Sequence, residues 1–317
     1  MEFVVKRTCD LSEIEIQQIN NLFEKVFEKK RTEREFLNQS VNNPIGYSYH
    51  SMMIENDSIV GLNSFVPSYY IVNGERMLFA NSTDSMVDKR YRDFFNFSDM
   101  VTAGFNQMKK DGVMFVYGYP NDNAYPVLIK SKLYQDIGKM HIYCLPIHIG
   151  GIKSSLNFLN PLSEFICKSF VTISGWFAST KSDKYYIEKE ASSYNISRYK
   201  RSDGKYNLAK IGDITIFFKI ILHEGIRTAF IIDLSVKSPQ AFNKAIKYIL
   251  KRHSCDFDLL LYPGYLNFFN SSMIRIPRRY EPKKFNLTGR VLNKKAFDLS
   301  IWKIGNWDTN LSNYDLI

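Results

Sequence analysis

Residues 80–136 constrain the fold more than any other stretch, because the pattern of apolar residues changes its period several times in a fixed order. An apolar strand ends at residues 85–87, and a basic turn follows at residues 88–92. A helix, a buried strand over residues 113–119, a Pro-Asn turn and a second helix come next. Five apolar residues give the first helix its spacing: Phe97, Met100, Val101, Phe105 and Met108. This order places helix N-termini beside strand ends, where a phosphate-bearing molecule can bind.

The motifs in this stretch resemble those of the GNAT family, the acyl-CoA-dependent N-acyltransferases. The resemblance is strongest over roughly residues 45–147, and it is closest to a subgroup with a G-Y-P-N run and a Trp…Asp pair near the end of the chain, here Trp307 and Asp315. The matching residues are Val87, Tyr91 and Arg92 for the first family motif, Gly118-Tyr119-Pro120-Asn121 with Ala124-Tyr125 for the second and, loosely, Leu133-Tyr134 for the third.

The resemblance implies an α+β fold of the GNAT type, in which helices flank a mixed, mostly antiparallel twisted sheet. Residues 1–147 are predicted to form a GNAT N-acyltransferase-like domain, and residues 148–195 a helical connector with an apolar helix over residues 156–176. Residues 196–317 are predicted to form a second GNAT-like domain, so that the chain has two GNAT-like halves. The second half repeats the order of elements, with strands expected at 213–222, 228–236, 257–262, 285–292 and 300–304 and helices at 238–252 and 265–271.

The resemblance also implies a chemistry, the transfer of an acyl group from acetyl-CoA or another acyl-CoA to an amine. A backbone N–H at the end of the first strand polarises the thioester carbonyl. Tyr125 corresponds to the general acid that protonates the leaving thiolate, and Asp84 to a base that deprotonates the amine. The residues expected to bind the cofactor are Met86, Val87, Asp88, Arg90, Arg92, Asn96, Phe97, Asn121 and Tyr125. The alternatives are that Tyr125 only lines a groove and that Asn121 only caps a helix.

The phosphate loop departs from the family pattern. The family places two glycines there so that backbone N–H groups can approach a pyrophosphate, whereas this chain has Asp93 and Phe95. Asp93 can cap the helix that follows and so fill the anion position from within. The alternative function is therefore a degenerate GNAT fold that acts as a non-catalytic binding or scaffold module.

The charge of the chain is unevenly distributed along the sequence. The formal net charge is +10, but residues 1–150 hold 16 Lys and Arg against 18 Asp and Glu, so the excess lies in the second half. A basic half suggests an acidic partner. We expect a small-molecule amine as acceptor, with an amino sugar as one candidate. Nucleic acid is not expected, except under the alternative of a Fem-type transferase, which uses aminoacyl-tRNA.

Other classes of protein find little support in the sequence. The four cysteines and five histidines show no metal-ligand spacing, so no metal is expected, and the cysteines are predicted to be free thiols. The apolar stretch at residues 154–180 contains Pro161, Glu164 and Lys168, and we expect it neither to span nor to rest on a membrane. The N-terminus lacks an apolar signal segment, which predicts a cytoplasmic protein. The sequence leaves the oligomeric state open.

Overall fold

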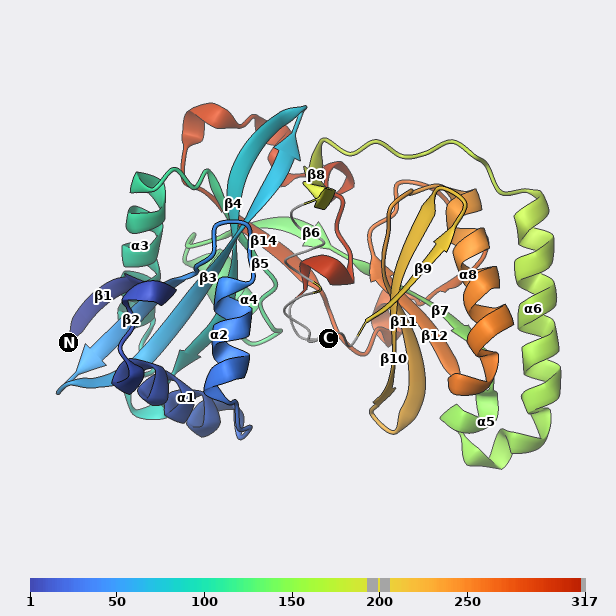
Figure 1. Ribbon diagram of the computed structural model, residues 1–317, viewed down its shortest axis with the longest axis horizontal. Helices are drawn as coiled ribbons and strands as arrows, with labels where there is room; N and C mark the ends of the chain where they lie inside the picture. Colours follow the sequence, from blue (N-terminus) through green and yellow to red (C-terminus); the bar gives the residue numbers. More distant parts are fainter. Residues whose placement is uncertain (193–198, 200–205, 315–317) are drawn as a thin grey trace. The chain divides into compact units, whose positions relative to one another are not determined.

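The computed structural model describes residues 1–192, 199 and 206–314. The chain divides into two compact units, each assembled from three segments. Unit 1 comprises the described residues of Met1–Gly138, Tyr186–Asp203 and Asn286–Lys303. Unit 2 comprises those of Lys139–Tyr185, Gly204–Phe285 and Ile304–Ile317. Each unit contains one sheet flanked by helices, and the predicted α+β fold class is confirmed (Figure 1).

Unit 1 is built on a twisted sheet in which the strand order is β1-β2-β3-β4-β5-β14-β6, with β8 paired to β3. The pairing of β4 with β5 is parallel, whereas β1–β2, β2–β3, β3–β4, β3–β8 and β5–β14 are antiparallel. The strands are β1 (Glu2–Arg7), β2 (Tyr49–Glu55), β3 (Ser58–Val72), β4 (Glu75–Val87), β5 (Phe115–Gly118), β6 (Gln135–Lys139), β8 (Ile187–Lys189) and β14 (Asn286–Val291).

Helices cover both faces of this sheet. Side chains of α1 (Glu13–Phe27) and α2 (Glu33–Val41) pack with Met52 of β2 in one core cluster. Side chains of α3 (Phe94–Lys110) and α4 (Ala124–Lys130) pack with Met53 in another. Because Met52 and Met53 are consecutive in a strand, they point to opposite faces of the sheet. The helices begin where the sequence supplies caps, since Ser12 and Thr32 each form a capping box with a glutamate three residues later.

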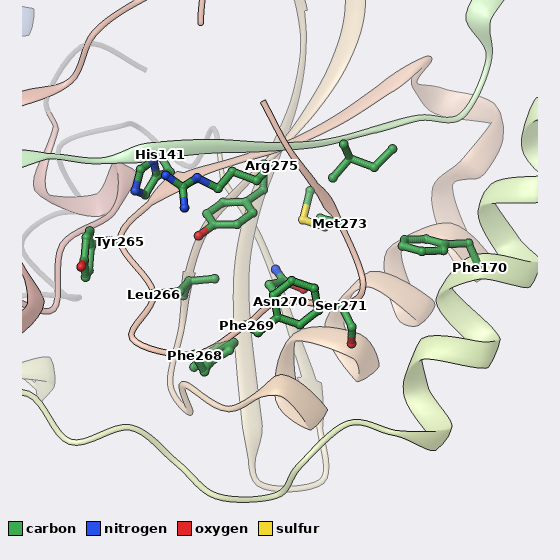
Figure 2. Close-up of a pocket in the computed structure, with 12 residues that line it drawn as sticks. His141, Phe170, Tyr265, Leu266, Phe268, Phe269, Asn270, Ser271, Met273 and Arg275 are labelled. Atoms are coloured by element: carbon green, nitrogen blue, oxygen red, sulfur yellow. The ribbon is translucent and has the colours of Figure 1, made fainter. Parts of the chain in front are cut away.

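Unit 2 has a second sheet, with strand order β13-β7-β12-β11-β10-β9. Only β11 and β12 pair in parallel among its strand pairs in the described residues. A cavity of about 530 Å³ lies between β7, the segment after β12 and α6, and most of its lining is apolar (Figure 2). The elements are β7 (His141–Pro146), α5 (Ile149–Ile152), α6 (Asn160–Trp176), β9 (Asn207–Ile211), β10 (Ile214–His223), β11 (Ile226–Leu234), α8 (Pro239–His253), β12 (Leu259–Gly264) and β13 (Ile274–Arg275).

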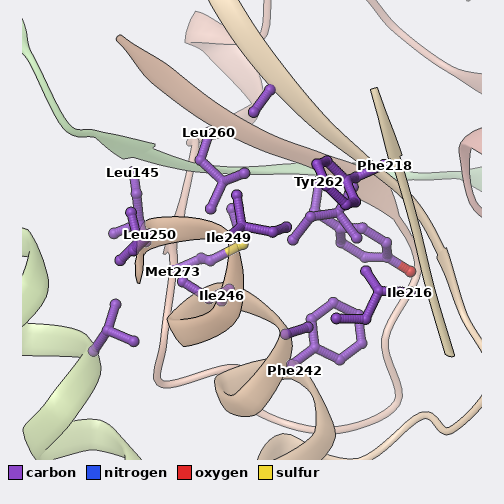
Figure 3. Packing of buried hydrophobic residues seen from close by; sticks show 14 of the residues in the cluster. Leu145, Ile216, Phe218, Phe242, Ile246, Ile249, Leu250, Leu260, Tyr262 and Met273 are labelled. Atoms are coloured by element: carbon purple, nitrogen blue, oxygen red, sulfur yellow. The ribbon is translucent and has the colours of Figure 1, made fainter. Parts of the chain in front are cut away.

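The core of unit 2 forms where α8 packs on the sheet (Figure 3). Phe242, Ile246 and Ile249 project from one face of α8 toward Leu260 and Tyr262 of β12. This spacing is that of a helix with one apolar stripe, as the sequence predicted. The helix begins with the Ser238 cap and Pro239, and its last turn carries Lys251, Arg252 and His253, which complement the helix dipole.

The two units share an arrangement of strands that the sequence hardly reveals. In unit 1, β4, α3 and β5 form a parallel strand pair joined by a helix, and β14 pairs with the far edge of β5. In unit 2, β11, α8 and β12 form the same unit, and β7 pairs with the far edge of β12. In each case the flanking antiparallel strand comes from a distant part of the chain.

Two local predictions are wrong. Residues 265–271, expected as a helix, follow β12 without regular structure. Residues 300–304, expected as a strand, contain part of a 3₁₀ turn over Leu299–Trp302 and the start of another at Ile304–Asn306. The strand expected at residues 285–292 exists as β14, but it belongs to unit 1 and not to unit 2. The predicted connector at residues 148–195 contains α5, α6 and β8, and its residues 193–195 lie outside the described residues.

Candidate active site

The strands β4 and β5 of unit 1 diverge at a defined point. Their parallel pairing runs from Phe79 opposite Phe115 to Ser82 opposite Gly118, where β5 ends. β4 continues for five more residues to Val87 and remains paired there with β3. Residues 83–87 therefore have no pairing to β5 within the described residues, and one edge of β4 is open to other partners.

Backbone geometry decides which groups face this open edge. The N–H of Asp88 donates to the carbonyl oxygen of Val60 on β3, at 2.9 Å. Backbone groups alternate in direction along a strand, so the N–H of Val87 points away from β3 and that of Met86 points toward it. Of residues 86–88 at the end of this strand, Val87 is therefore the one whose N–H faces the open edge, in the position of the backbone donor expected to polarise a thioester.

The basic turn after β4 is held together by Asp88. The side chain of Asp88 is buried and accepts hydrogen bonds from Lys25 Nζ at 2.7 Å and Arg90 Nη2 at 3.0 Å. These hydrogen bonds hold the pKa of the Asp88 carboxyl well below its usual range, and the bond from Arg90 has the largest effect. Arg92 Nε donates to the carbonyl oxygen of Val87 at 3.0 Å. Arg92 therefore fixes the turn to the strand end, whereas Arg90 holds the turn together from within.

The first turn of α3 is capped by Asp93, as the sequence predicted. Asp93 Oδ1 accepts hydrogen bonds from the backbone N–H groups of Phe95 at 2.7 Å and Asn96 at 3.2 Å. The N–H of Phe97 donates to the carbonyl oxygen of Asp93, four residues earlier, and this is the first hydrogen bond of the regular helical pattern. The ring of Phe97 packs against the core, whereas Phe95 is 73% exposed. Backbone donors that could hold a phosphate are thus engaged by a carboxylate of the chain itself.

Asn121 and Tyr125 lie at the start of α4, directly after β5. Asn121 Oδ1 accepts from the backbone N–H groups of Asn123 at 3.1 Å and Ala124 at 2.9 Å, so this side chain caps the helix. Tyr125 is half-buried beside Asp136. Burial and the Asp136 carboxylate raise the pKa of Tyr125 to about 12, which keeps its hydroxyl protonated at neutral pH.

Asp84 has a partner that the sequence did not indicate. It lies at a bulge of β4, where Asp84 and Ser85 oppose the single residue Asn63, and its φ of 49° is in the left-handed region. Its carboxylate forms an ion pair with the buried side chain of Arg31. Arg31 is further held between the rings of Phe23 and Phe36, at 4.2 and 4.9 Å from their centroids.

Arg31 could not be singled out beforehand. It stands in a charged run between two helices, a context typical of a solvated residue, and its partner is 53 positions away. The roles predicted for Asp84, Tyr125 and the cofactor-binding residues stay predictions. What the structure establishes is that the expected residues gather around the end of β4, the basic turn, the first turn of α3 and the start of α4.

The corresponding strand pair of unit 2 is occupied by the chain itself. The pairing of β11 with β12 ends at Phe230 opposite Leu261, while β11 runs on to Leu234. The 3₁₀ turn Leu311–Asn313 contacts both strands. Asn310 Nδ2 donates to Asp233 Oδ1 at 2.8 Å, and Gly264 of β12 bridges to Asn310. The C-terminal segment therefore fills the position that is open in unit 1.

A buried ion pair fixes this C-terminal segment. Lys237 Nζ contacts the carboxylates of Asp233 and Asp308, the latter at 3.3 Å, and all three groups are largely buried. Desolvation opposes the charge on Lys237, but the two carboxylates outweigh it and raise its pKa. Ser312 Oγ donates to Asp233 Oδ2 at 3.3 Å.

The fold is similar to that of N-acetyltransferases of the GNAT type. Residues 8–151 match the family described as "Acetyltransferase (GNAT) domain", a range that includes β4, the basic turn, α3, β5 and α4. No curated protein matches the sequence.

Solved structures with the same fold cover both units of this chain. One is a probable N-acyltransferase from Enterococcus faecalis, with a TM-score of 0.57 and 12% identity over 92% of this chain and 73% of the other. Two are GCN5-related N-acetyltransferases, both with a TM-score of 0.59 over 92% of this chain. The protein from Anabaena variabilis is 13% identical with 73% of its chain covered, and that from Kribbella flavida 12% with 72%. At these identities the likeness establishes the fold.

Residues 1–192, 199 and 206–314 contain no group of three or more His, Cys, Asp and Glu that could hold a metal ion. Within the same residues, no helix is both long enough and apolar enough to cross a membrane.

Proposed function

We propose that unit 1 transfers an acyl group from acetyl-CoA, or another acyl-CoA, to the amine of a small molecule. The observation that carries this proposal is the divergence of β4 and β5 after Ser82 and Gly118, which leaves the Val87 N–H on the open edge of β4. The match of residues 8–151 to the acetyltransferase (GNAT) domain lies over this site and supports acyl transfer as the general class of reaction.

The proposed step needs few groups. The amine nitrogen attacks the thioester carbonyl carbon, an amide bond forms, and the C–S bond breaks. The Val87 N–H donates to the carbonyl oxygen as negative charge builds on it. The Tyr125 hydroxyl gives its proton to the leaving sulfur, and the amine proton passes to a base. Asp84 is the proposed base, and its ion pair with Arg31 holds the carboxylate in place.

The residues present fit the thioester end of an acyl-CoA better than its pyrophosphate. The open edge of β4 offers the Val87 N–H, and Asn121 and Tyr125 lie at the end of β5. The first-turn N–H groups of α3 are bound by Asp93, whose charge also repels an anion. Lys89, Arg90 and Arg92 remain as the cationic groups of the turn. We therefore expect acyl-CoA to bind more weakly than it would at an uncapped, glycine-lined helix N-terminus.

The class of acceptor rests on charge alone. Unit 2 holds 19 Lys and Arg against 10 Asp and Glu, a net charge of +9, whereas unit 1 is nearly neutral at +1. A basic unit favours substrates that carry an anionic group. An amino sugar linked to a phosphate is the acceptor we would test first.

A second candidate function is favoured by the Asp93 cap. If this carboxylate excludes the pyrophosphate altogether, unit 1 is a GNAT fold without its cofactor, and the protein acts as a binding or scaffold module. A third candidate is a Fem-type transferase, which takes its acyl group from aminoacyl-tRNA and needs no phosphate loop for CoA.

Calorimetric titration of acetyl-CoA into the purified protein separates these candidates. Binding in the micromolar range, followed by acetylation of a panel of amines, would support the proposed function. Absence of heat and of any thermal shift at millimolar acetyl-CoA would contradict it. In that case, binding of aminoacyl-tRNA in a filter assay would favour the Fem-type activity, and no binding would favour the non-catalytic module.

A further inference from the structure

Helix α6 has a buried face of small side chains and an opposite, exposed face of large apolar side chains. Its inner face, formed by Cys167, Val171 and Ser174, is buried, and the Val171 carbonyl oxygen accepts a hydrogen bond from Asn243 of α8 at 2.6 Å. Its outer face is exposed to solvent, with Trp176 75% and Phe177, just past the end of α6, 81% exposed. We define the outer face as Leu162, Phe165, Ile166, Ile173, Trp176 and Phe177.

An apolar surface of this size needs a partner. Large aromatic side chains present ~150–250 Å² each, and with the exposed fractions of the six residues the outer face amounts to roughly 700–900 Å². Monomeric proteins rarely expose contiguous apolar patches beyond a few hundred Å². A stable protein–protein interface buries about 800 Å² on each partner. The outer face therefore has the size of one side of such an interface.

The spacing along α6 indicates what kind of surface covers it. Leu162, Ile166, Ser169, Ile173 and Trp176 follow each other at intervals of four, three, four and three residues. This is the repeat found along the seam between two packed helices. The β-branched residues Ile166 and Ile173 occupy alternate positions of the seam, which favours the association of two helices over larger bundles. The small residue Ser169 stands at the midpoint of the seam, where two helix backbones can approach closely.

We infer that this outer face is a dimer interface, in which α6 packs against α6 of a second copy of the chain. The same surface then serves both partners, as a two-fold axis requires. The charges of α6 also suit a protein partner, because Lys168 is paired with Glu164 at 2.6 Å. A helix that lies on an anionic bilayer carries several lysines or arginines on its polar face, whereas α6 has one lysine and no arginine.

Sedimentation equilibrium of the full chain tests this inference. We expect a dimer at micromolar concentration, and the double variant Phe165→Ser/Trp176→Ser should raise the dissociation constant by about 100-fold or more, because it removes two of the large aromatic side chains of the outer face. Phe95→Ser, which removes an equally exposed aromatic residue from unit 1, is the matched control and should leave the dimer intact. Phe165 and Trp176 are on the surface, so the double variant should keep the circular dichroism spectrum of the wild type, although loss of the partner lowers the unfolding temperature.

Cross-linking locates the seam. Ser169→Cys in a Cys9→Ser/Cys255→Ser background should form an intermolecular disulfide on mild oxidation, since the midpoint meets its own copy in parallel and antiparallel pairing alike. Thr180→Cys, placed beyond the helix, should not. A monomer at 100 µM, or a dimer unaffected by the double variant, would overturn the inference. So would co-sedimentation of the monomer with anionic vesicles that depends on Trp176, because it would assign the face to a membrane.

Discussion

The side chain of Arg92 is hydrogen-bonded to the backbone of Val87, with 3.0 Å between Nε and the carbonyl oxygen. This contact joins two parts of the proposed site, since Val87 offers its N–H to the thioester and Arg92 belongs to the turn expected to face the phosphates. A displacement of the basic turn would therefore act directly on the end of β4. The predictions below treat these two parts separately.

Val87→Pro should lower kcat at least 100-fold while acetyl-CoA still binds. Proline removes the N–H proposed to stabilise the oxyanion, and loss of one such donor costs about 10²–10³ in rate. The fold should tolerate the change because this N–H makes no bond in the β3 ladder. Met86→Pro is the matched control, because it removes a ladder donor and should destabilise unit 1. Steady-state kinetics measures the activity of the two variants, and thermal unfolding measures their stability. A fully active Val87→Pro enzyme would refute the role of this N–H.

Asp93→Asn should strengthen the binding of acetyl-CoA by about fivefold. Asparagine keeps an acceptor for the N–H groups of Phe95 and Asn96 but removes the negative charge, and one exposed charge contributes roughly 1 kcal/mol at this range. Asp93→Ala removes the cap as well and should cost about 1 kcal/mol of stability. Titration calorimetry measures the first effect and chemical denaturation the second. Equal affinity of wild type and Asp93→Asn would show that no phosphate lies near this residue.

Tyr125→Phe should lower kcat by about 100-fold without a change in unfolding temperature. The pKa of Tyr125 is raised to about 12, so the hydroxyl is protonated throughout the usual assay range. The wild-type rate should accordingly show no loss between pH 8 and about 11 that is due to this residue. Tyr280→Phe, at an exposed position of unit 2, is the control. Unchanged turnover of Tyr125→Phe would remove this residue from the chemistry.

The stability of unit 1 should fall as the pH drops below 6.5, in part because of His50. Its ring is buried between Thr8 Oγ1 and Ser64 Oγ, each at 3.0 Å, and burial, with the charge of Arg31, lowers its pKa from 6.5 to about 3. Between these values the unfolded chain binds the proton and the folded chain does not. Stability is then lost by up to about 1.4 kcal/mol per pH unit.

His50→Gln should flatten this dependence between pH 6.5 and 4, although the variant will be less stable at pH 7. Denaturation midpoints measured across this range give the slope for each protein. An unchanged slope in the variant would mean that other groups account for the acid sensitivity.

Lys237→Met should destabilise unit 2 by about 3–5 kcal/mol, because it leaves the buried Asp233 and Asp308 carboxylates without their cation. The triple variant Lys237→Met/Asp233→Leu/Asp308→Leu removes the uncompensated charges and should recover part of the loss. Differential scanning calorimetry measures the stability of the single and the triple variant. A single variant as stable as wild type would show that the ion pair does not hold the C-terminal segment.

Local features of the fold could be predicted from the sequence because they depend on neighbours. Ser12 and Asp93 read as helix caps and act as such. The turn at Asn73 and Gly74 reads as a hairpin, and both residues have the positive φ that such a turn requires. The apolar stripes of α3 and α8 likewise fixed the faces that are buried.

Features that depend on distant residues could not be predicted. No local pattern connects Arg31 with Asp84, since an ion pair of this kind is defined only by the folded chain. The Phe and Trp residues of α6 suggested a packed connector, but its largest apolar side chains lie on the exposed face, so the apolar pattern of this helix does not mark the buried one. The position of the C-terminal segment between β11 and β12 was equally hidden, as its contacts are formed by Asn and Ser side chains that are common in loops.

The pairing of β14 with β5 has a consequence for how the chain acquires its structure. Thr288 pairs with Gly118 across 170 positions, so the sheet of unit 1 lacks this strand until the chain has been synthesised well past residue 288. A fragment that stops near residue 147 would expose the unpaired edge of β5 and tend to aggregate. Biosynthesis must therefore proceed with the proposed catalytic unit incomplete, and its closure is a late event of slow, long-range strand pairing.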